Sequence, residues 1–247
     1  MQTVQKVEQV KHLPIKFGEV ARYVIVPGDP NRVPLIADSL ENPIHQGQNR
    51  EFNAYKGTYK GIEVSVVSTG IGCPSTAIAV EELSYIGAEV LIRIGTSGSV
   101  DKSATKGEIF IATAAVRDDG TSKQYIPIEF PAVATHDVVD NLIKASKDLE
   151  IDTKVGICQS KDSFFGETEP ERMPVAPYLD YKWSSWKKGG VGASEMEAAT
   201  LFTLSHIKKI KAGAILAIET SDKETVQDMT KIVLESITYM EGNRNVE

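Results

Sequence analysis

The chain has 247 residues, of which 41% are hydrophobic and 25% are charged, a composition that excludes fibrous and disordered classes of protein. The formal net charge of -7 argues against extended contact with nucleic acid or an anionic membrane. Only two cysteines occur, Cys73 and Cys158, without the spacing of a zinc site or a disulfide scaffold, and the first 13 residues lack the apolar run of a signal peptide. A cytoplasmic protein without a membrane segment is therefore expected.

The sequence pattern predicts strands that alternate with helices along the whole chain. Short apolar runs bounded by Gly or Pro mark the strands, and apolar residues at helical spacing mark the helices. In chain order the predicted elements are strand 22–26, a helix from Pro30, hairpin strands 55–60 and 62–68, helix 75–86, strands 90–94 and 108–116, helix 138–149, strand 154–158, helix 195–207, strand 212–218 and helix 226–240. This order predicts one α/β domain over 1–247, an α/β/α sandwich with a central twisted mixed sheet.

Two boundaries carry specific predictions. Asp29 is expected to cap the helix after the first strand, with Pro30 as its first helical residue. The stretch 166–181, rich in Glu and Pro, is expected to be a long irregular loop, and loops of that length in compact domains tend to be functional.

Glycine-rich breaks occur at the predicted ends of three strands, at Gly28-Asp29-Pro30, Gly70-Ile71-Gly72 and Gly95-Thr96-Ser97-Gly98. Each places backbone N–H groups at the carboxyl end of a strand, where open α/β sheets bind ligands. Arg32 follows the first break and Arg93 precedes the third, so guanidinium groups and backbone donors together predict a site for a tetrahedral anion. The alternative is that the glycines only permit tight turns and that Arg93 is a surface cation. No GxxxxGK[ST] motif occurs, so nucleoside triphosphate chemistry is not indicated.

The segment Ser194-Glu195-Met196-Glu197 supports two interpretations. As a capping box, the Ser194 side chain accepts from the amide of the third helical residue, while Glu197 reaches back to the Ser194 amide. As part of a binding site, Glu197 presents a bidentate acceptor to two vicinal sugar hydroxyls.

Three further features are ambiguous when each is taken alone. His12 lies in a charged N-terminal segment and is either a solvated residue or a site residue. Phe164 and Phe165 are either core residues or a wall on which a base stacks. Cys73 is expected to be a small packing residue, because nothing nearby resembles a nucleophile and its base.

Six short motifs occur here in the order seen in the hexameric nucleoside phosphorylases, and the resemblance extends from about His12 to the last helix. They are Gly28-Asp29-Pro30 with Arg32, Asn49-Arg50-Glu51-Phe52, Ser68-Thr69-Gly70-Ile71-Gly72, Arg93-Ile94-Gly95-Thr96-Ser97-Gly98, Glu129-Phe130-Pro131-Ala132 and Ser194-Glu195-Met196-Glu197. No single motif is specific, but the ordered set is. Lys161-Asp162-Ser163-Phe164-Phe165-Gly166, followed by Glu169-Pro170-Glu171-Arg172-Met173-Pro174, resembles the uridine phosphorylases in particular.

This resemblance implies a pentosyltransferase of nucleoside salvage that uses inorganic phosphate, and no organic cofactor, to split uridine into uracil and ribose 1-phosphate. It implies phosphate contacts from Gly28, Arg32, Arg93 and Thr96, and from Arg50 of a neighbouring subunit. It implies ribose contacts from Met196, Glu197 and, across the same subunit interface, His12, and base contacts from Phe164, Glu167 and Arg172. The implied catalytic residues are Arg93, Glu197, Arg172 and Glu167. It also implies a homo-hexamer built as a trimer of dimers, with a monovalent cation such as potassium near Glu51, Ile71 and Ser75.

The sequence departs from the uridine phosphorylase pattern at two places. Glu167 stands where a glutamine is typical, and an ionised carboxylate can only accept hydrogen bonds. The stretch Glu219-Thr220-Ser221-Asp222-Lys223 is also unusual, and its Ser221-Asp222 resembles, at a shifted position, the pair with which purine phosphorylases protonate the base. Three alternatives therefore stay open: a purine nucleoside phosphorylase of the same fold, a nucleosidase that uses water, and a non-catalytic nucleoside sensor.

Overall fold

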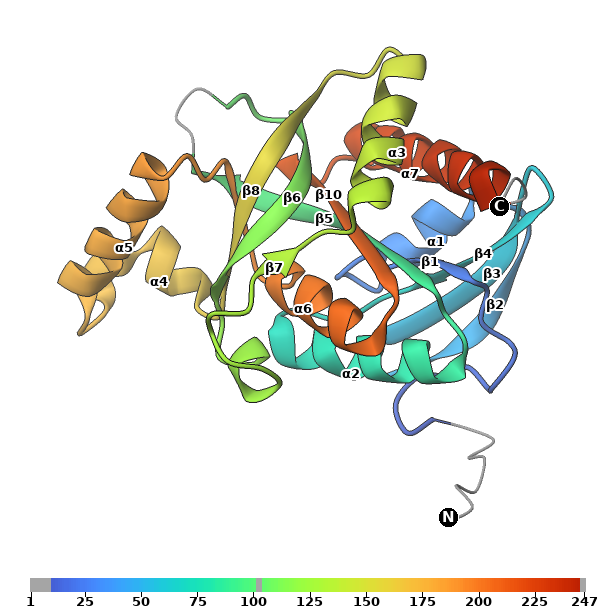
Figure 1. The fold of residues 1–247 in the computed structure, drawn as a ribbon, viewed down its shortest axis with the longest axis horizontal. Coiled ribbons are helices and arrows are strands. Elements are labelled where there is room, and N and C mark those ends of the chain that lie inside the picture. The colour runs from blue at the N-terminus through green and yellow to red at the C-terminus, as the bar shows by residue number, and fades with distance from the viewer. Residues whose placement is uncertain (1–9, 101–103, 245–247) are drawn as a thin grey trace.

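The computed structural model describes residues 10–100 and 104–244 of the chain, in which one mixed sheet runs through the whole structure (Figure 1). Its strands are β1 (Tyr23–Ile25), β2 (Glu41–Asn49), β3 (Phe52–Tyr59), β4 (Ile62–Val67), β5 (Val90–Ser99), β6 (Ile109–Asp118), β7 (Ala132–Val133), β8 (Thr153–Lys161), β9 (Ala193–Glu195) and β10 (Lys211–Ile218). The α-helices are α1 (Arg32–Ala37), α2 (Cys73–Ile86), α3 (His136–Asp148), α4 (Phe164–Thr168), α5 (Ala176–Lys188), α6 (Ala198–Lys208) and α7 (Lys223–Arg244). Two 3₁₀ turns, Ser122–Gln124 and Pro170–Arg172, complete the described elements.

The sheet has the strand order β10-β6-β8-β9-β5-β1-β4-β3-β2. β1 pairs in parallel with both β4 and β5, while β3 pairs antiparallel with β4 and with β2. β10 pairs with β6 and also with β5, so β10, β6, β8, β9 and β5 form a closed circuit at one end of the sheet. The predicted mixed sheet is confirmed, and the closure is a feature that the pattern of single elements could not reveal.

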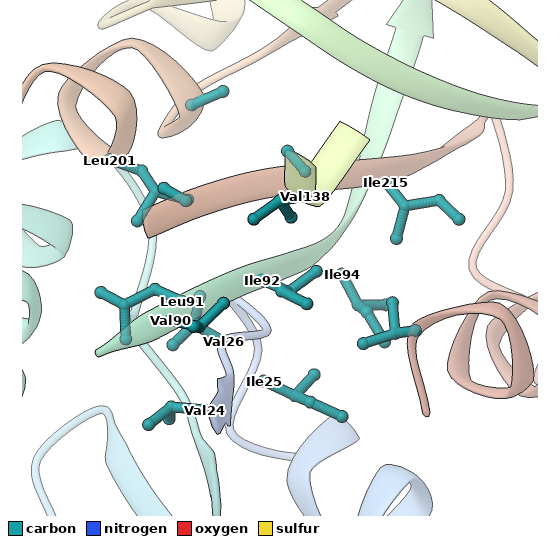
Figure 2. Close-up of a cluster of buried hydrophobic side chains, with 14 of the residues drawn as sticks. Val24, Ile25, Val26, Val90, Leu91, Ile92, Ile94, Val138, Leu201 and Ile215 are labelled. Carbon is teal, nitrogen blue, oxygen red and sulfur yellow. The ribbon is translucent and has the colours of Figure 1, made fainter. Parts of the chain in front are cut away.

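Helices cover the strands from two sides. α3 packs on α7 and α2 packs on α6, and the two pairs lie on opposite sides of the strands (Figure 1). Figure 2 shows part of the resulting core, in which Ile25 of β1, Ile92 of β5 and Ile215 of β10 belong to one cluster with Val138 of α3 and Leu201 of α6. The strands β1, β5 and β10 read as near-continuous apolar runs because parallel strands are buried on both faces.

Most predicted elements are present, but two of the boundaries that carried predictions were wrong. α1 begins at Arg32 rather than Pro30, because the Asp29 carboxylate accepts the Asn31 amide at 2.9 Å and closes a turn before the helix. β5 continues through Gly95-Thr96-Ser97-Gly98 to Ser99, because this segment pairs with β10 and then with β9. The glycine run is therefore part of a strand and not a break.

The expected irregular loop at 166–181 was also wrong. Most of it is helical, in α4, the Pro170–Arg172 turn and the start of α5. Ser163 Oγ caps α4 by accepting from the Gly166 amide at 3.0 Å, and a proline lies in the first turn of α5, where its missing N–H costs nothing. α4 and α5 project beyond the sheet in Figure 1. Across the described part of the chain, no helix has both the length and the apolar composition needed to cross a bilayer.

Candidate active site

A cavity of about 1250 Å³ opens at the carboxyl ends of β1, β4 and β5. Because these strands are parallel neighbours, Gly28, Gly70 and Gly98 meet at one edge of the sheet and line the cavity, as the glycine pattern predicted. Nine more of the candidate residues line it, namely Arg32, Glu51, Ile71, Arg93, Thr96, Phe164, Glu167, Met196 and Glu197. Sequence segments up to about 190 residues apart therefore form one site.

Arg93 lies at the floor of the cavity and is only 4% exposed, so the interpretation of a surface cation was wrong. Its Nε donates to Glu195 Oε2 at 3.0 Å, and its Nη2 donates to Glu197 Oε2. Burial opposes the positive charge, but the carboxylates of Glu197 and Glu195 outweigh it and raise the pKa of Arg93. Arg93 is therefore a permanent cation held in one orientation.

One nitrogen of the Arg93 guanidinium forms no hydrogen bond with the described residues. Arg93 Nη1 is buried and has no hydrogen-bond partner in the structure described. It faces Gly28, where an added Cβ would lie 3.6 Å from Nη1 and 3.3 Å from the Gly70 carbonyl oxygen. The hydroxyl of Ser97, also in the cavity wall, is buried without a partner as well. Buried donors without partners are costly, so these two atoms indicate a ligand with acceptor oxygens.

Two glycines are required by the packing of this end of the cavity. Gly95 lies two residues after Arg93 on the same face of β5, and a Cβ there would lie 2.7 Å from Arg93 Nη2. Gly70 has φ +75°, and a Cβ there would lie 2.5 Å from Glu51 Cγ. Both positions need glycine so that charged side chains can approach the backbone closely.

The capping-box interpretation of Ser194 and Glu197 was wrong, and Glu195 does the capping. Ser194 and Glu195 belong to β9, and α6 begins only at Ala198. The Glu195 carboxylate accepts from the amides of Glu197 and Ala198 at 2.8 to 3.0 Å while it also holds Arg93. A carboxylate at a helix N-terminus also interacts favourably with the helix dipole. One side chain thus starts α6 and positions the cavity arginine.

Glu197 is 5% exposed and reaches the cavity between Arg93 and the start of α2. Its Oε1 accepts from the Gly72 amide at 2.5 Å, and its Oε2 pairs with Arg93. Burial raises the pKa of Glu197, partly offset by the charge of Arg93. The neighbouring Met196 lines the same wall. Glu197 is therefore placed as an acceptor for hydroxyl groups that enter the cavity.

Arg32 is the second cation of this end. It lines the cavity from the start of α1, and no carboxylate within the described ranges lies within ion-pair distance of it. Partial burial is the main cause that lowers its pKa from the usual value, and Asp29 opposes the effect. Unlike Arg93, it therefore has its full hydrogen-bonding capacity available for a ligand.

A different set of groups lines the opposite end. Glu167 of α4 lies with its Oε2 2.9 Å from Lys161 Nζ and 2.5 Å from Ser194 Oγ. Lys161 Nζ also donates to Ser194 Oγ at 2.7 Å, and Ser194 lies 2.6 Å from Gln159 Oε1. Phe164 and Phe165, 53% and 54% exposed, form the adjacent wall, so they are not core residues.

Four candidate residues do not line the cavity of this chain. His12 lies with Nδ1 2.7 Å from Glu82 Oε1, and Arg50 is exposed at the turn between β2 and β3. Arg172 pairs with Glu169 on the surface. Ser75 Oγ donates to Glu51 Oε1 at 2.7 Å, which is the first cause of the lowered pKa of Glu51. Glu51 and Ser75 are therefore together, with the 80% exposed side chain of Ile71 nearby in sequence.

Asp222 lines the cavity but caps a helix there, and Cys73 packs in the core. The Asp222 carboxylate accepts from the Thr225 amide at 2.9 Å and from the hydroxyls of Thr220 and Thr225, so it caps α7. These contacts occupy the group that would have to protonate a purine. Cys73 is buried, its Sγ donates to the Met196 carbonyl oxygen at 3.2 Å, and burial raises the pKa of its thiol.

Sequence reasoning assigned no role to several residues that the structure places in the cavity wall, among them Ser97, Lys161 and Glu195. Ser97 and Glu195 lay inside motifs already singled out, but the burial of the Ser97 hydroxyl and the pairing of Glu195 with Arg93 could not be read from spacing. Lys161 lies 33 residues before Ser194 in sequence, and only the pairing of β8 with β9 brings them together.

Comparison with known proteins agrees with this geometry. The family model described as the phosphorylase superfamily matches residues 22–239. The chain is 41% identical to a uridine phosphorylase of Treponema pallidum, with 94% of this chain and 90% of that protein covered. It is 44% identical to a uridine phosphorylase of Thermococcus kodakarensis, with 84% of this chain and 76% of that protein covered. It is 39% identical to a guanosine phosphorylase of Halorubrum lacusprofundi, with 84% of this chain and 82% of that protein covered. With a model that matches most of its length, the chain belongs to the phosphorylase superfamily.

Proposed function

We propose that this protein is a nucleoside phosphorylase that uses inorganic phosphate to cleave uridine into uracil and ribose 1-phosphate. The observation that carries the proposal is the unpartnered, buried Nη1 of Arg93, which faces Gly28 in the wall of a nucleoside-sized cavity. Two relatives that cover most of the chain are named as uridine phosphorylases, and this supports a pyrimidine substrate.

Phosphate binds between the two arginines of the cavity floor. Arg93 donates from Nη1, Arg32 donates from a guanidinium that forms no ion pair with the described residues, and Ser97 and the backbone at Gly28 supply neutral donors. Charged donors and fixed neutral donors together suit a tetrahedral dianion. A nucleosidase that uses water has no need for a second cation at this place, so Arg32 favours phosphorolysis over hydrolysis.

Ribose lies above the phosphate, with its 2′- and 3′-hydroxyls on the Glu197 carboxylate and its ring against Met196. The base then points to the end of the cavity at Glu167 and Phe164. A phosphate oxygen forms a bond to C1′ as the bond from C1′ to the base nitrogen breaks, and the electron pair leaves with the base. The developing positive charge on the sugar lies next to the phosphate dianion.

Positioning supplies much of the rate, because holding two reactants in the correct geometry is worth roughly 7–11 kcal/mol. The protein contributes no nucleophile in this mechanism. Its own groups fix the phosphate, orient the sugar and contact the base.

We further propose that the active enzyme is a homo-hexamer in which Arg50 and His12 complete the site of a neighbouring subunit. Both lie outside the cavity of their own chain, and Arg50 is exposed at the tip of a hairpin. The Glu51 carboxylate and the Ser75 hydroxyl are hard oxygen donors, a set that fits a monovalent cation. Together with the carbonyl oxygen of Ile71, they would hold potassium between paired subunits and stabilise the pair.

Base release from uridine, inosine and adenosine, each with and without phosphate, tests the proposal. Uracil and ribose 1-phosphate should appear only when phosphate is present. Uridine turnover that is unchanged in phosphate-free buffer identifies a nucleosidase, and calorimetric binding of uridine without any base release identifies a sensor. A strong preference for inosine over uridine contradicts the pyrimidine assignment.

Arg32→Gln provides the matched test of the phosphate site. Loss of a charged hydrogen bond should raise the KM for phosphate roughly 10- to 100-fold, since such bonds contribute about 1.5–3 kcal/mol. The KM for uridine should change little. Arg22→Gln is the control, because Arg22 pairs with Glu89 at the opposite ends of the strands. An unchanged KM for phosphate in Arg32→Gln removes Arg32 from the site.

A further inference from the structure

The end of the cavity opposite Arg93 holds an ion pair between Lys161 and Glu167. Ser194, which contacts both residues, lies three positions before Glu197 in the chain. At about 3.3 Å per extended residue, these positions are at most ~10 Å apart. That span fits a ribose and the near part of a base. This inference rests on the proposed function, because it concerns the base in the same site.

Lys161 is unusually placed for a lysine, at only 7% exposure. An ammonium group has three N–H donors. One donates to Ser194 Oγ at 2.7 Å and another lies toward Glu167 Oε2 at 2.9 Å. The described residues provide no acceptor for the third, and Lys161 is part of the cavity wall. Lys161 therefore keeps one charged donor available.

Glu167 is the complementary partner. Its Oε2 takes the contacts from Lys161 and Ser194, while no hydrogen bond to its Oε1 is formed by the part of the chain described. Oε1 lies beside Gly98, where an added Cβ would be 3.5 Å away. The pair thus presents one free acceptor and one free donor side by side. A single amide side chain would present the same two functions.

We propose that Lys161 and Glu167 act as one base-reading unit, in which Glu167 accepts the ring N–H of the base and Lys161 donates to the carbonyl group next to it. Uracil, thymine and 6-oxopurines carry this N–H/C=O edge. Cytosine and adenine carry the reverse order, a ring acceptor next to an amino donor, and are rejected. Uridine and guanosine, for which two of the relatives are named, both carry this edge.

The same contact assists the departure of the base. When the bond to C1′ breaks, the electron pair is delocalised onto the carbonyl oxygens of the base. The Lys161 ammonium lies in a cavity wall largely shielded from water, where a charge stabilises a developing anion more strongly than in bulk solvent. Lys161 is therefore a substrate-contacting residue and not only the counterion of Glu167.

The wild-type enzyme gives the first test, which needs no variant. Phosphorolysis of uridine, cytidine and 3-methyluridine is compared by kcat/KM. Cytidine and 3-methyluridine should both react at least roughly 100-fold more slowly, the order of effect for a lost donor at a developing charge. Cleavage of cytidine as fast as uridine overturns the inference while leaving phosphorolysis itself established. No phosphate-dependent cleavage of any nucleoside means that the proposed function has failed.

The second test separates contact from positioning. Lys161→Met and Glu167→Ala are compared with wild type on uridine, 2-thiouridine, 4-thiouridine and 3-methyluridine, with folding checked by circular dichroism. Sulfur accepts hydrogen bonds weakly, so a lost contact to oxygen changes the ratio of kcat/KM between uridine and a thiouridine. Comparing this ratio between each variant and wild type cancels the difference in intrinsic reactivity of the two substrates. Lys161→Met should lose the discrimination against one thiouridine, and Glu167→Ala should lose the discrimination against 3-methyluridine.

Lys182→Met is the matched control. Lys182 pairs with Asp118, which accepts from Gln159 in the same network, but Lys182 does not line the larger cavity. Its substrate ratios should equal those of wild type. If Lys161→Met slows all four substrates and keeps both thiouridine ratios, Lys161 only holds Glu167 in place and the proposed contact is excluded.

Discussion

The two ends of the cavity are built in different ways. At the anion end, Arg93, Glu195 and Glu197 are each at most 5% exposed and come from β5, β9 and the residue before α6. At the base end, Phe164 is half-exposed and belongs to the five-residue helix α4, which projects beyond the sheet (Figure 1). The anion end is thus built mainly on the sheet, while the short helix α4 contributes to the base end.

This difference separates the part of the site that binds the groups common to all nucleosides from the part that binds the variable base. Phosphate and ribose are the same in every nucleoside phosphorolysis, and their contacts lie on strands that also carry the core. The base varies, and two of its contacts, Phe164 and Glu167, lie on the short helix α4 outside the sheet, while Lys161 lies at the end of β8. At both ends, internal ion pairs leave hydrogen-bonding atoms without a partner among the described residues, and the residues that carry these atoms line the cavity.

Arg93→Met should show the largest effect and tests the rigidity of the anion end. The change leaves two buried carboxylates, Glu195 and Glu197, without their cation, and breaking a buried pair in this way typically costs about 3–5 kcal/mol. We expect a lower urea midpoint together with loss of phosphorolysis. Lys60→Met, which breaks the surface pair with Glu235, is the control and should cost less than about 1 kcal/mol. Unaltered stability of Arg93→Met would mean that the pairs are not formed.

Phe164→Ala should have an intermediate effect and tests the base end. Loss of an aromatic contact of about 0.5–1.5 kcal/mol should raise the KM for uridine two- to roughly tenfold. Stability should stay within about 0.5 kcal/mol, because the side chain is already exposed. Tyr178→Ala, an exposed aromatic of α5 outside the cavity wall, should leave both quantities unchanged. A large loss of stability in Phe164→Ala would show that α4 supports the core.

Asp222→Ala removes the carboxylate that caps α7 and should have the smallest effect. Hydrogen bonds from Thr220 and Thr225 lower the pKa of Asp222 from 3.8 to about 2. Since the folded state favours the ionised form, this cap contributes stability above pH 3.8, and the contribution is lost as the pH falls toward 2. The Tm of Asp222→Ala should therefore lie slightly below that of wild type at neutral pH, and the difference should shrink on acidification. A difference that is constant with pH would exclude the carboxylate as its cause.

Much of the anion end could be predicted from local sequence. Glycine-rich segments after apolar strands, with Arg32 and Arg93 beside them, indicate where backbone donors and cations gather, because the carboxyl ends of parallel strands share one edge. The base end was predicted less well. The stretch 166–181 contains helices where a loop was expected, because Ser163 and the prolines of the first turns favour helix starts over irregular chain.

The sequence by itself determined the α/β class, most of the order of strands and helices, and the residues that meet at the sheet edge, because hydrophobic period and glycine placement are local properties of the chain. It did not predict the strands β2, β7 and β9 or the helices α4 and α5. Only the tertiary structure decided the partners: Glu195 rather than Ser194 as the cap of α6, Arg93 between two carboxylates, and Lys161 beside Glu167 and Ser194. An ion pair between β5 and β9 joins residues 102 apart, and its energy depends on burial and geometry that no spacing of residues records.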